Sequence, residues 1–118
     1  MATYIAGPLK AFASEAITID DTAGGKALST AEYADTTTAG TGYGSGLYKR
    51  RVKLAVVTVE TQQLRWTCDG TAPTSSVGHL ANVADSIILE GYDNIVAFRA
   101  IRATGSSSAV YVTYYRVP

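Results

Sequence analysis

The chain has 118 residues, enough for one domain with a hydrophobic core, and its ten basic and ten acidic residues cancel at neutral pH. A general nucleic-acid binder needs net positive charge to neutralise phosphates, so this class is excluded. One cysteine excludes a disulfide within the chain. The N-terminus lacks the pattern of a secretory signal, and no apolar run has the length of a membrane span. We expect no membrane association and synthesis in a cytoplasm.

Residues 1–14 are predicted to form an extended N-terminal arm. Tyr4, Ile5, Leu9 and Phe12 are apolar but follow neither the helical nor the strand period. Gly7-Pro8 favours extended backbone, because the residue before a proline avoids helical geometry. We expect the arm to contact a neighbouring subunit; the alternative is that it lies along its own domain.

The next segments predict one strand followed by irregular structure. Glu15–Asp20 alternates, with Ile17 and Ile19 facing inward, and an Asp-Thr-Ala-Gly-Gly turn follows. Ser29 and Glu32 have capping-box spacing, which predicts at most one helical turn. Residues 36–46 are rich in threonine and glycine and predict a flexible loop. They lack the flanking strand and helix of a phosphate-binding loop.

The stretch from residue 52 to residue 70 predicts two strands, the second ending in an Asp-Gly turn. The first strand is apolar on both faces, so we expect both of them to be covered. One of its faces carries Val52, Leu54 and Val56, and the other Ala55, Val57 and Val59. In the second strand Leu64, Trp66 and Cys68 share a face, with Trp66 predicted buried beside Leu64, Leu54 or Val56, and Phe98. Cys68 is interpreted as a small buried residue.

Three further strands are predicted, at residues 86–90, 95–102 and 109–117. In the last of them Val110, Val112 and Tyr114 alternate with Tyr111, Thr113 and Tyr115. Strands separated by turns, with no long helical period, predict an all-β fold. We expect an antiparallel β-sandwich of jelly-roll type, formed as one domain by residues 15–118.

The residue types that catalysis or metal binding needs are scarce. His79 is the only histidine and has no nucleophile-elbow pattern around it, and one histidine with one cysteine cannot form a zinc site within the chain. We therefore predict no enzyme activity, no cofactor and no metal. Exposed tyrosines, among them Tyr43, Tyr48 and Tyr92, could stack on sugars, but tyrosine is equally common at protein interfaces.

A series of short motifs runs through residues 52–117. In chain order it contains Thr58-Val-Glu60, then Leu64-Arg65 through Asp69-Gly70-Thr71-Ala-Pro73-Thr74, Gly78, Asn94-Ile95, Phe98-Arg99, Ile101-Arg102 and Val112-Thr-Tyr-Tyr-Arg116. This series resembles small β-rich virion structural proteins of tailed bacteriophages, of the capsid cement or decoration type. The resemblance implies a location in the virion and a non-enzymatic structural role. Head–tail, tail and fibre-base positions remain open, as does a carbohydrate-binding module.

The expected partners are the major capsid protein or other virion proteins, and further copies of the chain itself in a trimer or a dimer. The first 48 residues carry two basic and five acidic residues, so the remainder has a net charge of +3. Arginines suit protein contacts because a guanidinium can bind a carboxylate through two hydrogen bonds; Arg65 is one candidate, with solvation on the outer face of the sheet as the alternative. The predicted partner-contact residues are Tyr4, Ile5, Leu9, Phe12, Lys49, Arg50, Arg51, Arg99, Arg102 and Arg116.

Overall fold

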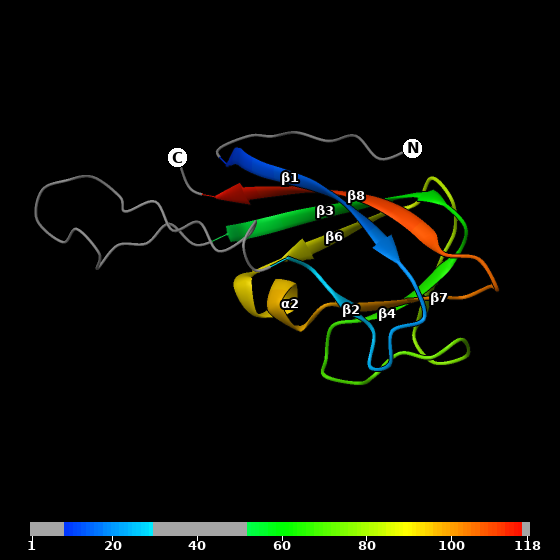
Figure 1. Cartoon of the computed structure of the whole chain (residues 1–118). Helices are drawn as coiled ribbons and strands as arrows, with labels where there is room; N and C mark the ends of the chain where they lie inside the picture. Colours follow the sequence, from blue (N-terminus) through cyan, green and yellow to red (C-terminus); the bar gives the residue numbers. More distant parts are fainter. Residues whose placement is uncertain (1–8, 30–51, 117–118) are drawn as a thin grey trace, which may run out of the picture.

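The structure, a computed structural model, describes residues 9–29 and 52–116. Within them the chain forms two four-stranded antiparallel sheets and one short helix (Figure 1). The first sheet has the order β1-β8-β3-β6, with bounds Lys10–Ile19, Ser108–Arg116, Val52–Thr61 and Ser86–Glu90. The second sheet has the order β2-β7-β4-β5, with bounds Lys26–Ala27, Arg99–Arg102, Leu64–Thr67 and His79–Ala81. Helix α2 spans Tyr92–Ala97. The all-β prediction is confirmed at this level.

One hydrophobic core is shared by both sheets and the helix. The first sheet contributes the inward side chains of β1, β3 and β8, the second contributes Leu64, Ala81 and Ala100, and α2 adds Ile95. Ile17 and Ile19 face inward, as predicted. The alternation predicted for the last strand is confirmed, with Val110, Val112 and Tyr114 fully buried.

The predicted arm boundary at residue 14 is wrong. Strand β1 begins at Lys10, and Ala13 and Ser14 pair with Tyr114 and Thr113 of β8, with a bulge just before them. The bulge interrupts the alternation that marks a strand in sequence, since it adds one residue to a single side of the ladder. Residues 10–14 therefore belong to the domain, while residues 1–8 lie outside the described part.

The strand predicted over residues 95–102 is a helix followed by a strand. The backbone N–H of Ile95 donates to the carbonyl oxygen of Gly91, and the side-chain amide of Asn94 donates to the carbonyl oxygen of Glu90. Gly91 has φ of 92°, which turns the chain out of β6 and into α2. Only β7, at residues 99–102, has the predicted extended conformation.

Trp66 and Cys68 are less buried than predicted. The Trp66 ring packs against the core and stacks on Phe98 with centroids 6.0 Å apart, but it remains partly exposed. Cys68, just beyond the end of β4, is also half-buried. Strand β5 is short and lies at the edge of the second sheet, so it covers Trp66 incompletely.

Several predicted features lie outside the described residues. These are most of the capping box, the loop at residues 36–46 and the basic residues 49–51. Among the described residues, no helix has the length and apolar character needed to cross a membrane.

Phe98 should contribute more to stability than Trp66, because Phe98 is only 1% exposed. We expect Phe98→Ala to lower the free energy of unfolding by about 3–5 kcal/mol, as for other fully buried aromatic residues. Trp66→Ala should cost clearly less, and Val96→Ala on the exposed side of α2 serves as the control. Urea denaturation measures all three; an equal or larger loss for Trp66→Ala would contradict the packing described here.

Candidate interaction face

The outward side of the first sheet is a surface with few charges; the exposed Lys53 and Glu60 stand at the two bulges of β3, outside its paired rows. Alternation along the strands sends every second side chain away from the core, and the antiparallel register aligns these positions in rows. The rows are Ala11, Tyr115, Leu54 and Glu90; Ser14, Thr113, Val56 and Ile88; Ala16, Tyr111, Thr58 and Ser86; and Thr18, Ala109 and Thr61. Glu90, at one corner on edge strand β6, is the only charged residue in these rows. We call this surface the outer face.

Apolar side chains of the outer face are open to solvent in the single chain. Ile88 is 51% exposed and Tyr111 is 42% exposed. Val56, in a central strand, is only 9% exposed although no described element covers it, because its neighbours Thr113 and Ile88 shield its sides. In Figure 1, α2 and the second sheet lie on the other side of the first sheet. The sequence prediction that β3 is apolar on both faces is confirmed, and its outward face has no cover among the described residues. The placement of Val52 on the face of Leu54 and Val56 is wrong, because a bulge between Val52 and Leu54 leaves Val52 buried in the core.

Hydroxyl groups supply most of the polarity of the outer face. The Ser14 and Tyr111 hydroxyls share a hydrogen bond of 2.7 Å across β1 and β8. The Thr58 and Ser86 hydroxyls lie 3.4 Å apart across β3 and β6. Each hydroxyl can donate as well as accept. The face can therefore adapt its hydrogen bonds to a partner without burying a charge.

The arginines of the second sheet bind within their own chain. Arg65 donates from Nε to the carbonyl oxygen of Ser75 and from Nη1 to that of Gly78, each at 3.1 Å. Arg99 donates from Nη1 to the carbonyl oxygens of Val96 and Phe98, at 2.9 and 2.7 Å. These bonds fix both side chains against loops of the domain. A partner contact by Arg99 stays a prediction.

Arg116 and Phe12, both predicted to contact a partner, lie inside the domain. Arg116 is only 8% exposed, and its guanidinium carbon lies 5.8 Å from the centroid of the Phe12 ring. The Phe12 ring is 6.4 Å from that of Tyr114 and packs against the core. The extension of β1 to Lys10 causes this arrangement, since it draws Phe12 onto the domain. Burial leaves Arg116 little surface to offer a partner.

The other predicted contact residues are only partly described. Leu9 is half-buried just before β1, and Tyr4, Ile5, Lys49, Arg50 and Arg51 lie outside the described residues. Their role in a partner contact stays a prediction.

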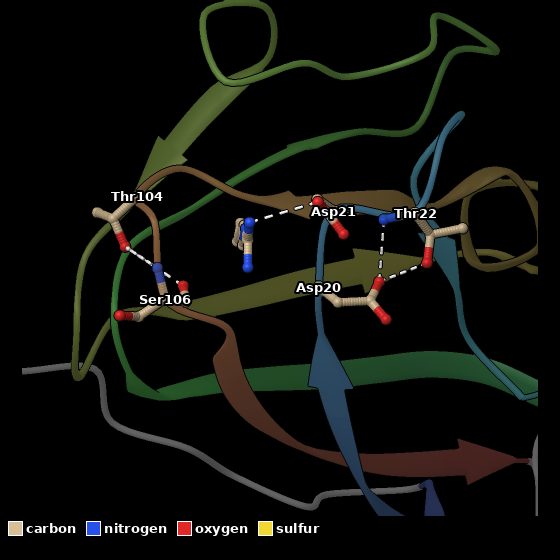
Figure 2. Close-up of polar contacts among 6 residues, drawn as sticks. Asp20, Asp21, Thr22, Thr104 and Ser106 are labelled. Carbon is tan, nitrogen blue, oxygen red and sulfur yellow. Dashed lines mark hydrogen bonds and ion pairs between the residues drawn. The ribbon is translucent and has the colours of Figure 1, made fainter.

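The turn between the two sheets is held by carboxylates. Figure 2 shows Asp20 accepting hydrogen bonds from the Thr22 hydroxyl and from the Thr22 N–H, the latter at 3.0 Å. These donors, the hydroxyl first, lower the pKa of Asp20 below its usual 3.8. The associated stabilisation is present above pH 3.8 and is lost as the pH falls through the lowered pKa. Asp21 forms an ion pair of 3.3 Å with Arg102, so that arginine too is engaged within the chain.

A shallow recess beside β4 and β5 brings Cys68, Asp69 and His79 into one wall, around about 370 Å³. Two of these side chains, Asp69 and His79, have partners within the chain. The Thr71 N–H donates to Asp69 at 3.0 Å and lowers the pKa of that carboxyl, and the His79 ring packs at a tilt of 40° against Trp66, with 4.9 Å between centroids. Within the described residues no three acidic, histidine or cysteine side chains are grouped to hold a metal ion. The recess offers no arrangement of nucleophile and oriented base.

The part of the motif series from Leu64 to Gly78 has structural tasks in the second sheet. Asp69 closes the turn before Thr71, and Gly70 has φ of 92°. Pro73 is buried, and Arg65 holds the loop up to Gly78. These residues shape one loop over β4.

The chain matches no known family model, no curated protein and no solved structure.

Only part of the outer face could be predicted from the sequence. Alternation identified the outward residues of β3 and β8, but Tyr111 and Ile88 were not selected as contact residues. The missing information was the pairing of β8 with both β1 and β3, which joins segments about fifty and about a hundred residues apart.

The close approach of Gly78 to β4 gives a graded prediction. A Cβ at Gly78 would lie 3.1 Å from the carbonyl oxygen of Trp66, and φ is +121°. Gly78→Ala should therefore cost more than the about 1–3 kcal/mol of backbone strain alone. Gly70→Ala, with φ of +92° but open space, should cost only the strain, and Gly105→Ala should be near neutral. Thermal unfolding ranks the three; equal effects would contradict the steric account.

Proposed function

We propose that the protein is a non-enzymatic structural subunit of a bacteriophage particle. In its most specific form, the proposal is that the protein is a capsid cement or decoration protein, folded as a jelly-roll-like β-sandwich and acting as an oligomer. The observation that carries the proposal is the outer face, a sheet surface that exposes Ile88 and Tyr111 and has one charge, at a corner, in its paired rows. Such a surface is typical of a component buried in an assembly.

A cement protein stabilises a shell by burying surface at the joints between shell subunits. Each joint that it covers removes apolar surface from water, worth about 25 cal/mol per Å². A subunit that contacts several shell proteins at once gains further affinity, because the later contacts are intramolecular. No reactive group is required for this, which agrees with the structural engagement of Asp69 and His79 described above.

The resemblance supports a virion role but leaves the place in the particle open. Its residues organise the loop over β4 and the core around Phe98, which any position in a particle would need. Head–tail, tail and fibre-base positions are therefore alternatives within the same proposal.

A carbohydrate-binding module is a second candidate, favoured by two of the three tyrosines of β8. Tyr111 and Tyr115 lie on the same side of one strand, among hydroxyl groups. Aromatic rings on a flat sheet can stack on sugars. Elsewhere in the described chain suitable rings are fewer, since Tyr92 is half-buried and packs against the core.

The particle experiment starts from the phage whose genome encodes the chain. A knockout of the gene is complemented with full-length protein or with a variant lacking residues 2–8, which leaves β1 intact. We expect the full-length chain in purified particles, and knockout particles that break at lower temperature. The shorter variant should fold normally but be incorporated less, because residues 1–8 are predicted to contact a neighbouring subunit.

Two outcomes of this experiment would contradict different parts of the proposal: the virion role, or the contact by residues 1–8. Absence of the full-length chain from particles, judged by mass spectrometry, would exclude the virion role. Full incorporation of the shortened variant would exclude only the contact by residues 1–8. A variant lacking residues 2–14 is the control for folding, since it loses half of the β1 ladder and should be destabilised.

A glycan array separates the two candidate functions. The carbohydrate-binding module predicts binding that Tyr111→Ala abolishes, with unchanged thermal stability because Tyr111 is exposed. The virion proposal predicts no glycan binding by either protein.

A further inference from the structure

We propose that the outer face is the contact between two copies of this chain, which pack face to face about a two-fold axis. The inference goes beyond the proposed function and concerns the isolated protein, so it stands or falls without the particle. In such a dimer every residue of the face meets the same surface of its partner. The face must therefore be compatible with itself in charge, hydrogen bonding, area and shape.

Charge is the first requirement, and the outer face meets it. A surface that carries charges of one sign repels its own copy, whereas the paired rows of the first sheet contain only Glu90, and the exposed Lys53 and Glu60 near the two ends of β3 have opposite signs. Glu90 lies at a corner, on an edge strand and in an end row, so a two-fold axis through the centre of the face keeps the two carboxylates apart. The outward side of the second sheet is unsuitable, because it would set Arg65 and Arg99 against their own copies.

Hydrogen bonding is the second requirement. A face made of donors only, or of acceptors only, would leave groups unsatisfied against its own copy, and burying such groups is costly. The polar groups of this face are hydroxyls, which donate and accept equally well. They are Ser14, Thr18, Thr58, Thr61, Ser86, Tyr111, Thr113 and Tyr115. A copy of the same face can thus satisfy them.

Area is the third requirement. Four strands spaced about 4.8 Å apart give a width of about 19 Å, and the span from Ala109 to Tyr115 gives a length of about 24 Å. The footprint is therefore about 450 Å² for each copy. Side chains stand up from the sheet, so the accessible area exceeds the footprint, and two copies together reach the about 1,000 Å² that a specific interface needs. Interfaces of this size include weak and transient contacts.

Shape is the fourth requirement. Two sheets pack face to face when their strands are aligned within about 30°, with side chains of both interdigitating. The exposed Ile88 and Tyr111 project from β6 and β8, while alanines at positions 11, 16 and 109 leave shallow positions in the rows. Projecting and shallow positions within one face can fit each other across a two-fold axis.

The test measures the mass of the full-length protein in solution by sedimentation at concentrations up to about 100 μM, a range that detects micromolar dissociation constants. Wild-type protein should be a dimer at the upper end. Ile88→Glu and Tyr111→Glu, each placing two like charges inside the contact, should weaken the dimer at least tenfold. Leu80→Glu is the matched control, since Leu80 is 45% exposed but lies on the second sheet.

Circular dichroism must show that each variant remains folded, and Ile88→Glu, on an edge strand, is the safest of them. Loss of the dimer in a folded face variant, with Leu80→Glu still dimeric, supports the proposal. A wild-type monomer at all concentrations, a trimer, or a dimer that Ile88→Glu does not weaken would overturn it. Equal loss in Leu80→Glu would overturn it too, because the association would then not be specific to the outer face.

Discussion

The pairing of β3 with β8 is the constraint on which the rest of the structure depends. Ala55 and Val57 lie opposite Tyr114 and Val112, and all four side chains are fully buried. A slip of one residue would turn the inward side chains of β8 outward and bury Tyr111, Thr113 and Tyr115 instead. The register of β1, which pairs with the other edge of β8, follows from the same alternation. The same register thus determines which side chains form the core and which form the outer face.

Much of this arrangement follows from local sequence, and the remainder depends on distant partners. Alternation in β8 and the two apolar faces of β3 are properties of short segments, so they were predictable. The extension of β1 to Lys10 was not, because a bulge breaks its period and its partner lies about a hundred residues away. Residues 95–97 alternate in sequence, yet contacts of Ile95 and Asn94 with the end of β6 favour one helical turn.

The candidate site was less predictable than the fold for a related reason. Arginines were selected as contact residues because of their chemistry, but chemistry alone does not tell whether a guanidinium binds a neighbour or its own backbone. Arg65 and Arg99 reach carbonyl oxygens of loops in the same chain, and Arg116 is drawn beside Phe12 by the extended β1. The residues that do form a continuous exposed surface are small, apolar or hydroxyl-bearing, and only their pairing across strands brings them together.

The two sheets turn different side chains outward: the first sheet presents mainly apolar and hydroxyl groups, and the second presents Arg65 and Arg99. Hydrogen bonds to carbonyl oxygens leave the positive charge of Arg65 and Arg99 in place, since a carbonyl group is neutral. A dimer formed through the outer face would therefore carry these two arginines on each of its outward sides. In the virion role proposed above, these sides would be the surfaces left for other proteins. Contact between copies and contact with a different protein would then use opposite surfaces, so neither would have to compete with the other.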